Sequence, residues 1–123
     1  LGAGMTWLRE RGLAAIQQHE RELTAQLIDG LQALSNVTLY GPAADAQRVG
    51  VVSFNLAGFD PQEVAAALDS AAGIEVRSGL HCAPRMHAAF GTAPAGTVRV
   101  SFGPFNIADD VEILLAAVSE MSS

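Results

Sequence analysis

The chain has 123 residues, of which 50% are hydrophobic and 16% are charged, with a formal net charge of −6. This length suits one globular domain with a single core, and the composition is too apolar for a disordered chain. The acidic balance argues against a nucleic-acid-binding protein, and the apolar runs are too short to span a membrane. We therefore expect neither a nucleic-acid partner nor a membrane partner.

Two helices are predicted at the start of the chain. Residues 4–11 predict a short helix that ends at Gly12, and residues 13–34 predict a longer one. Gly30 lies inside the second helix, where a glycine costs about 1 kcal/mol relative to alanine. The longer helix carries one apolar stripe, formed by Ile16, Leu23, Leu27, Leu31 and Leu34. We expect this stripe to pack on a sheet.

The middle of the chain predicts two strands and a capped helix. Residues 37–40 indicate a short strand, and residues 50–56 are rich in β-branched and aromatic side chains, which favours a central strand. Asp60 as N-cap, Pro61 at the first helical position and Glu63 three residues after the cap predict a helix start. This helix is expected to end at Gly73.

The last third of the chain predicts two strands and two helices. Residues 74–77 indicate a short strand and residues 84–90 a helix that ends at Gly91. Residues 97–102 alternate with period two, so that Val98, Val100 and Phe102 face one way and Arg99 faces the other. A final helix over 109–121 follows Asn106 or Ala108.

This order of elements predicts an α/β (α+β) two-layer sandwich. The strands are few and short, and helices are interspersed among them. We expect a mixed or antiparallel sheet of about four strands, with helices on one face.

The single cysteine, Cys82, lies in the run Arg77-Ser78-Gly79-Leu80-His81-Cys82-Ala83-Pro84, which follows a predicted strand. A lone cysteine is often a buried structural residue. A loop flanked by glycine and proline favours exposure instead, and Arg77 and His81 are groups that can favour a reactive thiolate. One cysteine and three histidines show no zinc-ligand spacing, so we expect no metal site. The chain has no lysine and therefore cannot form a lysine Schiff base with a carbonyl group.

Arg99 is the second candidate, because an arginine held on a strand can grip a carboxylate with two hydrogen bonds. Arg77 has the same character one strand earlier, although a surface arginine in a loose ion pair is the commoner case. His81 is either a general acid or base or a residue that supports the loop. We expect His87 and His19 to lie on helix surfaces.

Two ordered motifs resemble the C-terminal signature of class V aminotransferase-fold enzymes, closest to the SufS-like cysteine desulfurases and selenocysteine lyases. The motifs are Arg77-Ser78-Gly79-Leu80-His81-Cys82-Ala83, and Gly96-Thr97-Val98-Arg99-Val100-Ser101-Phe102 followed by Phe105-Asn106. The resemblance covers nearly the whole chain and implies the C-terminal domain of a pyridoxal-phosphate-dependent transferase fold. Leu80 stands where many of these enzymes have a histidine, which suggests a related subgroup.

The resemblance implies a role for each site residue. Cys82 matches the cysteine that attacks the substrate sulfur and becomes a persulfide. Arg99 matches the arginine that binds the α-carboxylate, and Arg77 matches the arginine that opens the cysteine loop. No residue here matches the cofactor-binding residues, so pyridoxal phosphate is expected only in a full-length enzyme and not in this chain alone.

The resemblance also implies a domain organisation. Residue 1 is leucine, so we expect a piece of a longer protein. Residues 1–12 would end the connection from a large cofactor-binding domain, absent here, and residues 13–123 would form the small domain. The full-length enzyme would be a cytoplasmic homodimer that acts on cysteine or selenocysteine, with a sulfur-acceptor protein as a candidate partner. A selenocysteine lyase, another class V enzyme and a freestanding α/β binding domain remain the alternatives.

Overall fold

The structure is a computed structural model that describes residues 1–43 and 48–123. The elements follow the order α1 (Gly2–Arg11), α2 (Leu13–Gln32), β1 (Val37–Tyr40), β2 (Val51–Leu56), α3 (Pro61–Ala72), β3 (Arg77–Gly79), α4 (Pro84–Phe90), β4 (Thr97–Ser101) and α5 (Ala108–Ser122). The four strands form one sheet in the order β1-β2-β4-β3, and every pairing is antiparallel. The predicted fold class is therefore confirmed.

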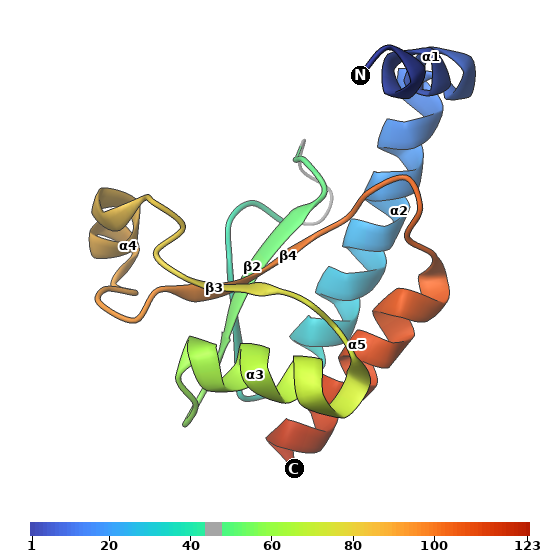
Figure 1. The fold of residues 1–123 in the computed structure, drawn as a ribbon. Coiled ribbons are helices and arrows are strands. Elements are labelled where there is room, and N and C mark those ends of the chain that lie inside the picture. Colours follow the sequence, from blue (N-terminus) through green and yellow to red (C-terminus); the bar gives the residue numbers. More distant parts are fainter. Residues whose placement is uncertain (44–47) are drawn as a thin grey trace.

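Three helices cover one face of the sheet. α2, α3 and α5 lie together on this side, whereas α4 stands on the opposite side (Figure 1). The strands alternate accordingly: Val52, Phe54 and Leu56 of β2 are buried against the helices. Val98 and Val100 of β4 point the same way. The sheet therefore has an apolar helix-covered face and an opposite face, here called the open face, that carries the intervening residues.

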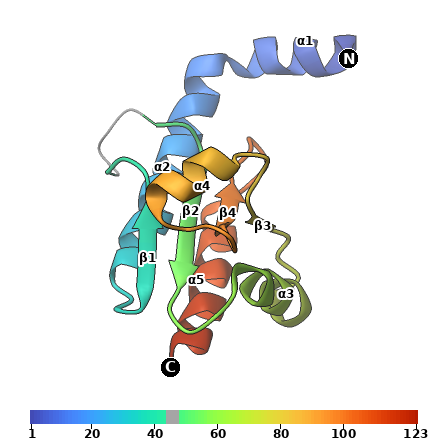
Figure 2. The same ribbon diagram turned by 90° about the vertical axis from the view of Figure 1, so that its left-hand side faces the viewer.

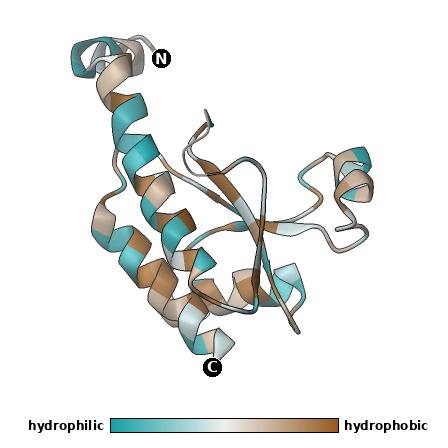
Figure 3. Cartoon of the chain, turned by 180° about the vertical axis from the view of Figure 1, so that it is seen from behind, coloured by the Kyte–Doolittle hydropathy of each residue, from teal (hydrophilic) through white to brown (hydrophobic). Residues whose placement is uncertain are grey.

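The apolar stripe of α2 packs into this core as predicted. Leu27 and Leu31 are fully buried, and Figure 3 shows hydrophobic and hydrophilic residues alternating along the helix. At Gly30 an added Cβ atom would lie 2.3 Å from Leu115 Cδ1, so the Leu115 side chain would have to move. The missing side chain at Gly30 leaves room for Leu115 of α5, and this contact accompanies the helix cost of the glycine.

α1 turns away from the rest of the molecule at Gly12, which has φ of +87° (Figure 2). α1 has no buried residue, and Trp7 lies against Phe105 with ring centroids 5.0 Å apart. α3 begins as predicted: Asp60 accepts a hydrogen bond from the Gln62 backbone, and Glu63 accepts one from the Asp60 backbone. None of the described helices is long and apolar enough to cross a membrane.

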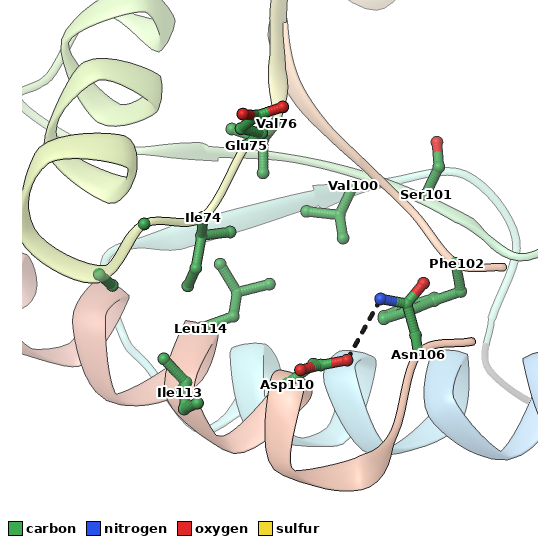
Figure 4. A pocket seen from close by; sticks show the side chains of 12 residues that line it. Ile74, Glu75, Val76, Val100, Ser101, Phe102, Asn106, Asp110, Ile113 and Leu114 are labelled. Carbon is green, nitrogen blue, oxygen red and sulfur yellow. Dashed lines mark hydrogen bonds between the residues drawn. The ribbon is translucent and has the colours of Figure 1, made fainter.

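The predicted strand over 74–77 is wrong in its position, since β3 begins only at Arg77. The chain before it lies apart from β4, and a cavity of about 280 Å³ separates the two segments. Figure 4 shows Ile74 and Val76 on one side of this cavity and Val100 on the other. The two backbones are therefore not hydrogen-bonded partners until they converge at the Arg77–Arg99 pair.

The last helix begins at Ala108, one residue before the predicted start, and Ile107 is its N-cap. Asn106 instead donates from its side chain to Asp110, which also accepts from the Ile107 backbone (Figure 4). The acidic first turn of α5 thus satisfies a free backbone N–H group at its start.

Candidate active site

The register of the sheet places a row of polar side chains across the open face. Tyr40 of β1 pairs with Ser53 of β2, Ser53 with Arg99 of β4, and Arg99 with Arg77 of β3. Arg99 is half-buried between the core residues Val98 and Val100, and so projects from the open face as predicted. The structure therefore brings together the two arginines that the sequence singled out.

The pairing of Arg77 with Arg99 puts two positive charges directly opposite each other. Like charges in such a cross-strand pair destabilise a sheet. Within the described part of the chain neither guanidinium forms an ion pair, and the buried Nε of Arg99 has no hydrogen-bond partner. This arrangement suits an anion, because one carboxylate or phosphate group would satisfy donors from both strands.

Cys82 lies in the segment between β3 and β4, here called the cysteine loop (residues 80–96). Its side chain is exposed, which agrees with a reactive thiol rather than a structural one. His81 and Cys82 have φ of +51° and +62°, although neither is glycine. A left-handed conformation is uncommon for residues that carry a side chain, and such strained residues are frequent at active sites. The tight turn is closed by a hydrogen bond from the Ala83 backbone N–H to the Leu80 carbonyl oxygen.

His81 fastens the cysteine loop to β4. Its Nε2 lies 3.1 Å from the Thr97 carbonyl oxygen, and a carbonyl can only accept, so Nε2 carries the proton. Burial lowers the pKa of His81, and the positive charges of Arg99, His87 and Arg77 add to this effect, while the bond to Thr97 opposes it. These effects favour the neutral ring, and the contact with Thr97 ties the cysteine loop to β4.

Two histidines lie elsewhere than expected. His87 is not on a helix surface but is the buried side chain of α4, with 8% of its area exposed. Its Nδ1 is 2.7 Å from the Thr92 hydroxyl, and its ring centroid is 5.9 Å from that of His81. His19 is half-buried and contacts the Asn106 carbonyl oxygen at 2.6 Å. Both predictions failed because they assumed that a polar residue of a helix faces water, whereas tertiary contacts supply partners here.

Two glycines close the base of the cysteine loop. Gly96 has φ of +84°, and a Cβ atom there would lie 2.0 Å from the Gly79 carbonyl oxygen. Only glycine permits this approach of β3 and β4. Asn55 adds a tie from β2, because its amide donates to the Gly96 carbonyl oxygen at 3.0 Å. The sequence did not indicate a role for Asn55, because its partner Gly96 is 41 positions away. It did not indicate Thr92 either, because Thr92 lies outside both motifs.

Comparison with known proteins gives a consistent result. The aminotransferase class-V family profile matches residues 1–114. A probable cysteine desulfurase from Staphylococcus epidermidis is 36% identical over 120 residues, which cover 98% of this chain and 28% of that protein. A second probable cysteine desulfurase, from Halalkalibacterium halodurans, is 42% identical over 115 residues, which cover 93% of this chain and 27% of that protein.

Solved structures agree with these relatives. The apo structure of a cysteine desulfurase from Thermococcus onnurineus NA1 has a TM-score of 0.91 and 39% identity, covering 98% of this chain and 29% of that one. The cysteine desulfurase CsdA (S-sulfonic acid) from Escherichia coli has a TM-score of 0.83 and 27% identity, covering 96% and 28%. The chain thus spans little more than a quarter of the length of these proteins. Sequence and fold together show that this chain belongs to the aminotransferase class-V family.

Proposed function

We propose that this chain supplies the sulfur-accepting loop and the carboxylate-binding strand of a cysteine desulfurase, which converts L-cysteine to L-alanine. The observation that carries the proposal is the exposed Cys82 in a strained turn, on the loop that joins the two arginine-bearing strands. The activity belongs to the complete polypeptide, and the 123-residue chain alone is inactive. Residues 1–12 would end the connection from a large domain, and residues 13–123 would be the small domain.

The residues of this chain do not fit the binding of pyridoxal phosphate, which the family implies. The cofactor needs an amine for its Schiff base, and the chain contains no lysine. We therefore assign the cofactor site to the remainder of the enzyme. There the cofactor would withdraw electrons from the bound amino acid. What this chain contributes is binding and nucleophilic chemistry.

Cys82 would act as the nucleophile towards the substrate sulfur. Its thiolate attacks Sγ of the substrate, and a new S–S bond forms while the substrate Cβ–Sγ bond breaks. The electron pair of the broken bond stays with Cβ, which gains a proton, so that alanine leaves and Cys82 keeps the sulfur as a persulfide. The exposure of Cys82 gives a sulfur acceptor access to the persulfide afterwards.

Arg99 would bind the α-carboxylate of the substrate and hold Sγ within reach of the thiolate. Its buried, unpartnered Nε and its neighbour Arg77 support this role, because together they offer an anion more than one donor. His81 would support the loop through its bond to Thr97.

We further propose that the complete enzyme is a homodimer that passes its sulfur to an acceptor protein. A reducing compartment such as the cytoplasm would keep the single exposed thiol of Cys82 reduced. The family assignment argues against the alternative of an unrelated freestanding binding domain.

The test uses variants of the complete enzyme, assayed for alanine release from cysteine and from selenocysteine. Cys82→Ala should abolish persulfide formation from cysteine while substrate binding persists. Arg99→Ala should weaken apparent substrate affinity about ten- to a hundredfold, as expected for the loss of a charge-assisted contact. Arg85→Ala removes an exposed arginine of α4 as the matched control and should leave both unchanged.

Each role can fail separately. Full desulfuration by Cys82→Ala would exclude the persulfide role. An unaltered dependence on cysteine concentration in Arg99→Ala would exclude the carboxylate role. A clear preference for selenocysteine would reassign the enzyme to the lyase alternative.

A further inference from the structure

α4 begins two residues after Cys82, at Pro84. α4 stands apart from the helices that cover the sheet (Figures 1 and 2). It therefore has no large apolar interface to fix its place, and its apolar side chains Met86 and Phe90 are 59% and 55% exposed. Something other than hydrophobic burial must hold this short helix and the strained turn before it.

A buried polar pair occupies the inner side of α4. His87 and Thr92 are each 8% exposed, and the ring Nδ1 and the hydroxyl oxygen are 2.7 Å apart. The Thr92 hydroxyl also lies 3.3 Å from the His87 carbonyl oxygen, which accepts the Thr92 backbone N–H at 2.8 Å. The His87 Nδ1 atom and the Thr92 hydroxyl are thus both satisfied within the pair, which removes the cost of burying them.

This pair is part of a closed circuit of contacts that includes Cys82. The His87 backbone N–H donates to the carbonyl oxygen of Ala83, the residue after Cys82, at 3.2 Å. The Thr92 carbonyl oxygen accepts from the Gly96 backbone at 2.7 Å. Thr97, the next residue, accepts the bond from His81, the residue before Cys82. Both neighbours of Cys82 are therefore tied, one through His87 and Thr92 and the other directly to β4.

We propose that His87 and Thr92 are a positioning pair, whose side-chain contact fixes α4 and so places the Cys82 thiol for attack on sulfur. This inference rests on the proposed function of Cys82. Neither residue need touch the substrate: the pair acts through the backbone of Ala83 and the turn at His81 and Cys82. A displacement of a nucleophile by about 1 Å can reduce a rate by about a hundredfold.

The test is a set of variants of the complete enzyme with paired conservative changes. Thr92→Val removes the hydroxyl at nearly constant shape, and Thr92→Ser keeps it. His87→Asn places a polar atom near the position of Nδ1, whereas His87→Gln places one near Nε2 and loses the contact. Thr24→Val is the matched control, because Thr24 of α2 is also buried and its hydroxyl donates to a backbone carbonyl oxygen, that of Glu20, at 2.7 Å.

Thr92→Val and His87→Gln should lower kcat for persulfide formation about tenfold or more. KM for cysteine should change little, because Arg99 itself makes none of the contacts of the circuit. Thr92→Ser and His87→Asn should restore most of kcat. Thr24→Val should lower the melting temperature but not kcat. If a variant at Thr92 does not fold, the comparison of His87→Gln with His87→Asn tests the inference, and the Thr92 variants do so if a His87 variant does not fold.

Other outcomes would overturn the inference. Unchanged kcat in Thr92→Val and His87→Gln would do so, as would a loss that Thr92→Ser and His87→Asn fail to restore. Inactive Cys82→Ala together with fully active pair variants would reject the positioning role alone. Fully active Cys82→Ala would reject the proposed function itself, so the two failures are distinguishable.

Discussion

The close approach of Gly96 to Gly79 gives the sharpest stability prediction. In Gly96→Ala the new Cβ atom would lie 2.0 Å from the Gly79 carbonyl oxygen and 2.2 Å from its carbonyl carbon. Both contacts are with backbone atoms, so no side chain can rotate away. The substitution must therefore separate β3 from β4 at the base of the cysteine loop.

The expected cost has two parts. The left-handed conformation at φ of +84° destabilises an alanine by about 1–2 kcal/mol. Weakening the short β3–β4 pairing adds about 1 kcal/mol for each hydrogen bond lost, so a total of roughly 3 kcal/mol or more is expected. Gly58→Ala is the matched control, because Gly58 has φ of +86° and no heavy atom within 4 Å of the added Cβ. Gly58→Ala should lose only the conformational part of this stability, about 1–2 kcal/mol.

Urea denaturation of both variants, followed by far-UV circular dichroism, measures the difference. Circular dichroism is preferable to fluorescence because the only tryptophan, Trp7, lies in α1 outside the core. If Gly96→Ala is no more destabilised than Gly58→Ala, the close approach at the loop base is wrong.

Three further predictions concern the core, the last helix and the cofactor. Leu27→Ala should cost roughly 2–5 kcal/mol, because the side chain is fully buried, and an unchanged denaturation midpoint would contradict the packing of α2. The hydrogen bonds from the Ile107 N–H and the Asn106 amide lower the pKa of Asp110. The ionised Asp110 therefore stabilises the fold at pH values above the pKa of an unfolded aspartate, about 3.9, and this stabilisation is lost as the pH falls through the lower pKa of the folded state. The deficit of Asp110→Asn in urea should therefore appear at neutral pH and vanish in acid; a deficit independent of pH would reject this assignment. Because it lacks lysine, the chain titrated with pyridoxal phosphate should show no saturable Schiff-base absorbance, and a stoichiometric band would refute the division of the active site.

Local patterns predicted most of the elements. The α2 stripe, the Asp60–Pro61–Glu63 start of α3 and the glycines that follow α3 and α4 depend on residues within a few positions of each other. Their physical causes are helical periodicity, capping and the left-handed preference of glycine, which act at short range. The alternation in β4 likewise predicted which face Arg99 would occupy. The strand predicted over 74–77 failed because pairing depends on a distant partner, from which the cavity separates it.

The sequence by itself determined the composition of the candidate site: one cysteine in a glycine- and proline-flanked run, two strand arginines and no lysine. Only the tertiary structure decided how these residues are arranged. Register across β3 and β4 places Arg77 opposite Arg99, and contacts between residues 16 and 5 positions apart hold His81 on Thr97 and His87 on Thr92. Such contacts form when the sheet and the cysteine loop close, because strand pairing and burial, not local propensity, select the partners of a polar side chain.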